Sequence, residues 1–335
     1  MRHIGKYGGG GFDFLSAVLA VEYIARTCAA LALSFVTHII LCTDTLFRHS
    51  NEEQRMKYLP RLCSGENIGA LAITEPNAGS DATGIQLSAV KKGNGYVLNG
   101  TKMFITNGPI ADIFVVYAKT DKSKKAKGIT AFIVERDFGG FSVSKHLEKI
   151  GHRGSPTSEI VFEDCFVPEE NLLGEYNQGV AVMMSGLDRE RTAIAGIPLG
   201  IAQNSLDLSV KYASEREQYG QPIGNFQFIQ GKLADMFTKV EASRLLIYKA
   251  ASIANKRPKG GKGTVIHKYA ASALLFAGEV ATQASMDALQ IHGGYGYTLE
   301  YPVNRLFREG KLWDIAAGTA EMRRIIIARE LLMEV

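Results

Sequence analysis

Four short runs decide the fold of this sequence: Tyr96-Val-Leu-Asn-Gly-Thr101, Ile113-Phe-Val-Val-Tyr117, Ile129-Thr-Ala-Phe-Ile-Val134 and Glu159-Ile-Val-Phe162. β-branched and aromatic residues dominate each run, and turns rich in Gly and Asn separate them. Such side chains pack well on a pleated sheet, so the runs predict strands joined by hairpins. We expect an all-β domain, a sandwich or a barrel, over residues 68–174.

Helix-forming residues precede this region. Residues 13–47, with Asp13 as the expected N-cap, are apolar at too many positions for a single stripe, which predicts a helix buried on several sides. A shorter helix is expected to start at Glu52, and Pro60 is expected to end or kink it.

Helices are also expected after the β-domain, over residues 178–214 with a bend at Gly196 and Pro198, then over 226–255, 263–291 and from 312 to the end. The turn at 256–262 should fold the middle two back antiparallel. The sequence therefore predicts an α+β multidomain protein. Its parts are a partial N-terminal helical domain (1–67), the β-domain (68–174) and a C-terminal domain resembling a four-helix bundle (175–335).

The composition of the 335 residues excludes several classes of protein. Hydrophobic residues make up 46% and charged residues 21%, as in ordinary globular proteins, and the net charge of +4 is spread along the chain. The one compact basic run, residues 122–127, is typical of a solvated loop, so we expect no nucleic-acid partner.

Cysteine spacing and hydropathy give no sign of a metal, a disulfide framework or a membrane. The four cysteines form no CxxC or Cys/His cluster, which favours a reducing compartment. The N-terminus does not resemble a signal peptide. No apolar run is expected to be long enough to span a bilayer, because Ser34, Thr37 and His38 interrupt the most apolar segment.

One carboxylate interrupts an apolar stripe. Hydrophobic residues recur at helical spacing at Met183, Leu187, Ile194, Ile197 and Ile201. Glu190 occupies the gap in this series. Desolvation there would raise the pKa of the carboxyl and make it a better base. Alternatively, Arg189, Arg191 or a distant cation neutralises it, and the stripe alone leaves both possibilities open.

Five segments combine Gly, Thr, Ser and Asn with apolar neighbours, as close backbone approach to a polar ligand requires. They are Ile73–Gly84 (ITEPNAGSDATG), Lys102–Gly108 (KMFITNG), Arg216–Gly220 (REQYG) with Gln227, Gln290–Gly296 (QIHGGYG) and Ala317–Glu321 (AGTAE). Taken singly, each predicts only a turn.

Together and in this order, these segments resemble the acyl-CoA dehydrogenase family, flavoenzymes that desaturate acyl-CoA thioesters, and the match covers the whole chain. SGLDRER (Ser185–Arg191) and AGTAE most resemble the isovaleryl-CoA type. The resemblance implies FAD as cofactor. It also implies that the flavin and the thioester tail are lined by Leu71, Ile73, Thr74, Gly79 and Ser80.

The resemblance further implies that Phe104, Ile105 and Thr106 flank the isoalloxazine, with the Thr106 hydroxyl near flavin N5. The alternative for Phe104 and Ile105 is plain core packing in a strand. The cofactor's pyrophosphate and adenine would be held, in part from a neighbouring subunit, by Arg216, Gln227, Gln290, Gly293 and Gly294, and Thr319 and Glu321 would complete the nucleotide site. The alternative for Arg216 is a surface salt bridge with Glu215 or Glu217.

The implied reaction removes two hydrogens, the α one as a proton to a base and the β one as a hydride to flavin N5. In many members the base is a glutamate immediately before the Gly-Thr of the last motif, where this sequence has Ala317. In isovaleryl-like members it lies on the helix after the β-domain, and Glu190 matches it. Asp188 and Arg191 resemble residues that touch the pantetheine arm, and the substrate site is expected to include Ser80, Leu187, Ala317 and Gly318 as well.

Two features depart from the family pattern. The position of Phe104 is usually tryptophan, so an indole N–H is lost there. The chain also begins inside the family's N-terminal helical domain. Either this is the natural start and one wall of that domain is missing, or the start is truncated or misassigned.

We therefore expect an acyl-CoA dehydrogenase of fatty acid or branched-chain amino acid catabolism, acting on a short or branched acyl-CoA. It would be a homotetramer that passes electrons to an electron-transfer flavoprotein. The expected compartment is the cytoplasm in a bacterium or the mitochondrial matrix in a eukaryote, and not the exterior. The alternatives are a straight-chain medium- or long-chain dehydrogenase, an oxidase of the same fold, and a non-catalytic flavin or acyl-CoA binding protein.

Overall fold

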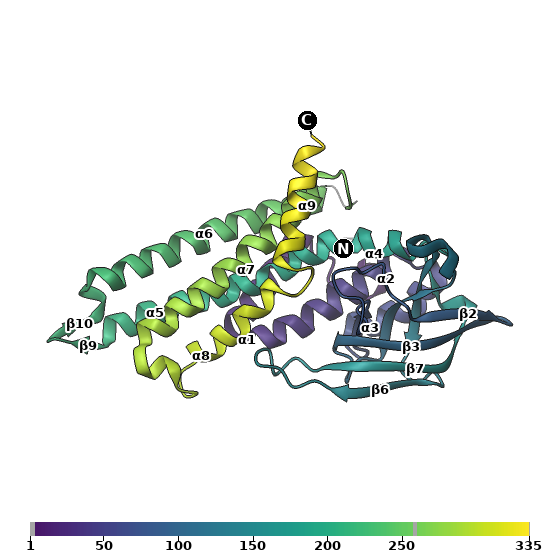
Figure 1. The fold of residues 1–335 in the computed structure, drawn as a ribbon, viewed down its shortest axis with the longest axis horizontal. Coiled ribbons are helices and arrows are strands. Elements are labelled where there is room, and N and C mark those ends of the chain that lie inside the picture. Colours follow the sequence, from purple (N-terminus) through teal and green to yellow (C-terminus); the bar gives the residue numbers. More distant parts are fainter. Residues whose placement is uncertain (1–3, 257–259, 335) are drawn as a thin grey trace. The chain divides into compact units, whose positions relative to one another are not determined.

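The structure is a computed structural model that describes residues 4–256 and 260–334. It contains two compact units, which we call the β-unit and the helical unit. The β-unit comprises the chain up to Asp13, Ser34–Glu148 and Gly154–Leu187, and the helical unit comprises Phe14–Leu33, Lys149–Arg153 and the chain from Asp188. Figure 1 labels their elements.

In the β-unit, the described residues form one eight-stranded sheet of order β6-β7-β3-β2-β4-β5-β8, with β1 beside β4. The strands are β1 Gly69–Ala72, β2 Ser88–Lys92, β3 Gly95–Thr106, β4 Ile113–Lys119, β5 Ile129–Glu135, β6 Phe141–His146, β7 Thr157–Pro168 and β8 Leu172–Leu173. Strand β4 pairs in parallel with β1 and β2, and the other neighbours are antiparallel. The four runs predicted as strands are parts of β3, β4, β5 and β7.

Both faces of the sheet are covered. Along β4, Phe114 and Val116 enter one hydrophobic core, whereas Val115 and Tyr117 enter the other. This alternation follows the two-residue period of a strand, and an apolar run without polar positions is expected where both faces are buried. Leu59, from a helix, packs in the second core.

The N-terminal helices are α1 Phe14–Val36, the π-helical η2 Thr37–Asp44, α2 Thr45–His49 and α3 Glu52–Ser64. A capping box between Asn51 and Gln54 starts α3. The expectation that Pro60 might end this helix is wrong, because α3 continues to Gly65, whose φ of 80° gives a left-handed C-cap. Pro60 lies inside the helix, just before the last turn, where it removes one N–H donor, and Gly65 still terminates the helix.

The helical segment Phe14–His49, which is kinked at the non-helical backbone of Cys28 (φ −145°, ψ 96°), is long and apolar enough to cross a membrane by length and composition. The expectation that the chain has no such run is therefore wrong. Within the helical unit, however, this helix buries Val18 and Val21 completely. Its Glu22 accepts hydrogen bonds from Arg244 (3.2 Å) and Tyr248 (2.6 Å). These contacts are typical of a core helix in a folded domain.

The helical unit is built on α5 Gly196–Glu215, α6 Gln227–Lys256, α7 Val265–His292, α8 Val303–Gly310 and α9 Ala320–Leu332. Helix α7 packs against α5, α6 and α9 (Figure 1). Small residues on α7, among them Ala270, Ala277 and Ala281, are fully buried and let the neighbouring helices approach closely. The helix predicted over 178–214 is two helices, α4 Gly179–Ile194 and α5, which meet at Ala195.

We predict opposite effects of alanine at two helical glycines. A Cβ on Gly278 of α7 would lie 2.8 Å from the Trp313 carbonyl oxygen, whereas a Cβ on the exposed Gly231 of α6 would meet nothing within 4 Å. Gly278→Ala should therefore destabilise the fold by about 1–3 kcal/mol. Gly231→Ala should stabilise it by about 0.5–1 kcal/mol. Thermal unfolding of the two variants, with the wild type alongside, measures both; a rise in Tm for Gly278→Ala would contradict this packing.

Candidate active site

Helix α4 carries Glu190 in the part of the chain that belongs to the helical unit. Burial raises the pKa of its carboxyl from 4.5 to about 7, and the neighbouring Arg191 partly opposes the rise. The side chain is nevertheless half-buried and not sealed in the core. A carboxyl group of this kind is partly ionised at neutral pH and is a much stronger base than an exposed glutamate.

No cation among the described residues forms a salt bridge with Glu190. The geometry therefore does not support the alternative in which a neighbouring arginine neutralises this carboxylate. Arg191 instead lies 3.4 Å from the Asp188 carboxylate. The Arg189 guanidinium lies over the ring of Phe14, 4.2 Å from its centroid. Both nearby guanidinium groups are therefore engaged away from Glu190.

The loop that contains Ala317 lies against this part of α4. Arg191 Nε donates to the Ala317 carbonyl oxygen at 3.4 Å. Ala317 has a φ of 56° and Gly318 a φ of 89°, so both are in the left-handed region. The fully buried Arg323 of α9 holds the same loop by donating to the carbonyls of Trp313 (2.6 Å) and Ala316.

Thr319 and Glu321 begin helix α9. The Thr319 hydroxyl caps the helix by accepting from Met322 N at 3.3 Å. Glu321 is exposed in the first turn. Its own backbone N–H, and then the Thr319 hydroxyl, lower the pKa of its carboxyl. The structure therefore gives Thr319 a capping role that the motif alone did not reveal.

A pocket of about 450 Å³ lies elsewhere in the helical unit. It is lined by Tyr212, Arg216, Gln218, Ile223, Ile291, His292, Gly293, Gly294, Tyr295 and Thr298. It brings together three of the residues expected at the cofactor's nucleotide end, Arg216, Gly293 and Gly294. Gln227 and Gln290 are exposed at the start of α6 and the end of α7 and do not line it.

The chemistry of this pocket suits a phosphate group. No carboxylate in the described part of the chain pairs with Arg216, whose guanidinium lies 5.7 Å from the Tyr295 ring centroid. A salt bridge with Glu215 or Glu217 is therefore not formed. Gly293 has a φ of 59°, and a Cβ on Gly293 or Gly294 would meet nothing within 4 Å. A guanidinium beside open glycine backbone is an established arrangement for binding phosphate oxygens.

Aromatic residues that sequence reasoning missed also line this pocket. Tyr212 and His292 stack with centroids 4.2 Å apart. Burial lowers the pKa of His292, whose Nδ1 lies 2.8 Å from the Ala288 carbonyl oxygen. The ring is therefore neutral at pH 7. The signal for His292 was present in the QIHGGYG motif, whereas nothing in the sequence pointed to Tyr212.

In the β-unit, a buried ion pair joins two of the predicted flavin-binding segments. Lys102, which has no exposed surface, donates to Glu75 (2.8 Å) and to the Ile73 carbonyl (2.9 Å). Met103 N donates to the Thr74 carbonyl at 2.8 Å. Burial lowers the pKa of Lys102 to about 8, even though Glu75 favours the charged form. The pair fixes the loop after β1 against β3.

The predicted flavin-lining residues of the β-unit differ in exposure. Leu71, Ile73, Thr74 and Thr106 are half-buried, and Gly79 and Ser80 are exposed. Within β3, a register shift between Lys102 and Ile105 interrupts the alternation of side chains. As a result Phe104, with a φ of 61°, is 64% exposed, whereas Ile105 is 2% exposed and packs in the core.

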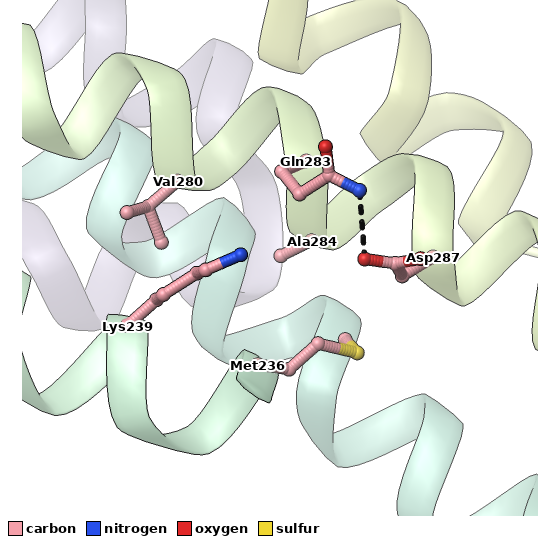
Figure 2. Close-up of a pocket in the computed structure, with 6 residues that line it drawn as sticks. All are labelled: Met236, Lys239, Val280, Gln283, Ala284 and Asp287. Carbon is pink, nitrogen blue, oxygen red and sulfur yellow. Dashed lines mark hydrogen bonds between the residues drawn. The ribbon is translucent and has the colours of Figure 1, made fainter. Parts of the chain in front are cut away.

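A second, shallow depression between α6 and α7 contains none of the predicted site residues (Figure 2). It is lined by Met236, Lys239, Val280, Gln283, Ala284 and Asp287. Gln283 donates to Asp287 at 2.9 Å, and Lys232 also pairs with Asp287. The Asp287 carboxylate is thus already occupied by two neighbouring side chains.

Three family domains match the chain in order. The acyl-CoA dehydrogenase N-terminal domain matches residues 3–66, the middle domain 70–165 and the C-terminal domain 177–332. The chain belongs to the acyl-CoA dehydrogenase family. The predicted family, fold class, FAD cofactor and oxidoreductase activity on acyl-CoA are thereby confirmed.

Individual relatives show which members of the family this chain resembles. The mitochondrial isovaleryl-CoA dehydrogenase of Oryza sativa subsp. japonica is 51% identical over 329 residues, which cover 98% of this chain and 79% of that protein. Butyryl-CoA dehydrogenase from Megasphaera elsdenii is 43% identical with a TM-score of 0.94, covering 98% of this chain and 85% of that one. A chain in a structure described for the electron transferring flavoprotein of Acidaminococcus fermentans is 44% identical with a TM-score of 0.95, with the same coverage of 98% and 85%.

The raised pKa of Glu190 predicts a pH-dependent cost in stability. The folded carboxyl holds its proton up to about pH 7 and the unfolded one only to about 4.5, so the wild type loses stability as pH rises between these values. Glu190→Gln resembles the protonated form at every pH. The Tm of the variant minus that of the wild type should therefore be larger at pH 8 than at pH 5. An equal difference at both pH values would contradict the raised pKa.

The pocket around Arg216 predicts a loss of FAD retention in Arg216→Ala. Hydrogen bonds to charged groups contribute about 1.5–3 kcal/mol, so the variant should bind FAD about 10- to 100-fold more weakly. Lys211→Ala is the matched control, since Lys211 is an exposed cation near the end of α5, the helix that Arg216 caps, and does not line the pocket. Flavin fluorescence after dilution of the holoenzymes measures release. Equal release of flavin from both variants would show that Arg216 does not bind the cofactor.

Proposed function

We propose that this protein desaturates a short branched acyl-CoA thioester between its α and β carbons, with Glu190 as the base that removes the α-proton. The observation that carries the proposal is a half-buried carboxyl of raised pKa on α4, with both adjacent guanidinium groups engaged elsewhere. Ala317, at the position where many family members have the glutamate, contacts the same stretch of helix through Arg191.

The chemistry sets what Glu190 must do. A thioester α-proton is a weak acid, and a base is most effective when its pKa lies near the working pH. A pKa of about 7 meets this requirement. The carboxylate takes the α-proton, and the electron pair of that C–H bond forms the new C–C π bond. The β-hydrogen leaves with its own electron pair, which balances the oxidation.

The protein offers residues for FAD in each unit. Arg216, Gly293 and Gly294 would hold phosphate oxygens, and the loop after β1, fixed by Lys102, would offer backbone groups and the Thr74 hydroxyl to the ring system. Bound FAD supplies the acceptor for the β-hydrogen and its electron pair.

The relatives support a short acyl chain. The names of the rice and Megasphaera elsdenii proteins specify five-carbon branched and four-carbon straight acyl groups, and identity to the rice protein is higher. We therefore place the chain with the isovaleryl type, and a straight-chain substrate is the second candidate. Turnover with isovaleryl-, butyryl- and octanoyl-CoA distinguishes them, and preference for octanoyl-CoA would exclude both short-chain assignments.

Exposed aromatic residues support self-association. Tyr219 and Phe228 of the helical unit are 95% and 93% exposed, and Tyr297 and Leu299 are also exposed. Burying large apolar side chains such as these in a contact between subunits would be favourable, because it removes apolar surface from water. We propose a homotetramer, as the family resemblance implies, with an electron-transfer flavoprotein as electron acceptor.

The domain boundaries 1–67, 68–174 and 175–335 remain part of the proposal, as does a location in the bacterial cytoplasm or the mitochondrial matrix.

Glu190→Gln tests the base directly. The variant should keep FAD and bind acyl-CoA, but anaerobic flavin reduction by substrate should slow by about 10²–10⁴-fold, as expected for loss of a general base. Glu309→Gln is the matched control, because Glu309 is another buried carboxyl whose pKa burial raises, on α8. Stopped-flow absorbance measures reduction. A Glu190→Gln rate close to that of the wild type would refute the assignment and favour a different base.

A further inference from the structure

Asp188, two residues before Glu190 on α4, is fully buried. Three donors from the described residues reach its carboxylate: His267 Nδ1 at 2.7 Å, Gly261 N at 2.7 Å and Arg191 Nη1 at 3.4 Å. Because an ionised carboxylate only accepts, the His267 nitrogen must carry the proton. With no exposed surface and its oxygens occupied by protein donors, this side chain is poorly placed to touch a pantetheine arm.

Gly260 and Gly261, which precede α7, lie against this carboxylate. A Cβ on Gly260 would lie 2.7 Å from Asp188 Oδ2, and Gly261 has a φ of 107°. Both positions therefore require glycine while the loop contacts Asp188. A second carboxylate, Glu330 of α9, accepts from Gly263 N at 3.0 and 3.1 Å and holds the other side of the loop.

On its other side, Asp188 orients Arg191. The Arg191 guanidinium is buried and divides its donors between the Asp188 carboxylate and the Ala317 carbonyl. Ala317 needs external support, because its left-handed backbone is unfavourable for a residue with a Cβ. A chain of contacts thus runs from His267 through Asp188 and Arg191 to Ala317, beside the base.

We propose that Asp188 and His267 are positioning residues for the dehydrogenation: Asp188 fixes the Arg191 guanidinium between the carboxylate and Ala317, and His267 fixes Asp188. This inference rests on the proposed function, in which Glu190 is the base. While Arg191 is held by Asp188 and Ala317, it cannot turn to pair with Glu190. Released from Asp188, it would be an unpaired buried cation one residue away from the base, and pairing with Glu190 would satisfy it.

Two substitutions should disturb the position of Arg191, and a third, conservative one should preserve it. Asp188→Asn eliminates the charge that holds Arg191, and His267→Leu eliminates the donor that holds Asp188. Because a misplacement of about 1 Å can cost about 100-fold in rate, anaerobic flavin reduction should slow about 10- to 100-fold in both holoenzymes. His267→Gln keeps an N–H donor and should recover the rate to within about threefold of the wild type. The dissociation constant of an unreactive acyl-CoA thioether should change less than about twofold.

Glu330→Ala is the matched control, since it frees the same loop at Gly263 without touching Arg191. Its reduction rate should stay within about twofold of the wild type. An equal loss of reduction rate in Glu330→Ala would mean that only the folding of the loop matters. Weaker thioether binding by Asp188→Asn at an unchanged reduction rate would mean that Asp188 contacts the pantetheine arm of the substrate. Either result overturns the proposal.

The two histidine variants decide the question even if Asp188→Asn does not fold. Wild-type rates in both, beside an inactive Glu190→Gln, would refute positioning while leaving the proposed function intact. A fully active Glu190→Gln would instead refute the proposed function. Equal slowing in His267→Leu and His267→Gln would also count against the proposal, because the N–H donor would then be irrelevant.

Discussion

The candidate site depends on how one guanidinium group is shared. Arg191 directs its donors to Asp188 and to the Ala317 carbonyl, so the carboxyl of Glu190 stands beside a cation without being paired to it. A full ion pair would lower the pKa of Glu190 and leave a poor base, whereas complete isolation in the interior would keep it protonated. Burial raises the pKa of Glu190, and Arg191 opposes the rise only in part, so the pKa is about 7. Helix α4, through Asp188, and the loop that contains Ala317 together hold Arg191 in this position.

The β-unit uses the same physical device for a different purpose. Lys102 and Glu75 form an ion pair inside the protein, and each also bonds to backbone groups, Lys102 to the Ile73 carbonyl and Glu75 to the amides of Gln86 (2.6 Å) and Leu87 (2.9 Å). A buried pair is costly to desolvate, so its benefit lies less in stability than in defining one arrangement of the chain. In both units the charged pair joins a glycine-containing motif to a regular element, and the motif is thereby rigid where a ligand would need it to be.

Much of the secondary structure could be predicted from local pattern, since β3, β4, β5 and β7 contain the four apolar runs. Strand β6 could not, because four of its six residues are polar, the other two are only half-buried, and it lies at the edge of the sheet. The site shows a sharper limit. Glu190 was detectable because it breaks a helical stripe, but Lys102 meets Glu75 across 27 positions and His267 meets Asp188 across 79. The hydrophobic periodicity of a sequence does not predict such pairings, because the two residues meet only when the chain folds.

The placement of Glu190 on a helix has a consequence for the diversification of such enzymes. A base carried by a loop ties the sequence of that loop to the proton-transfer step. Here the residues from Trp313 to Thr319 are held by Arg323 and by the cap of α9, through contacts to backbone carbonyls and one hydroxyl. Contacts to the backbone tolerate changes of side chain. In the proposed function, the positions of this loop whose side chains are exposed or half-buried and make none of these contacts, such as Ile315 and Ala316, are therefore free to vary, and new acyl preferences can arise there while the chemical step is inherited unchanged.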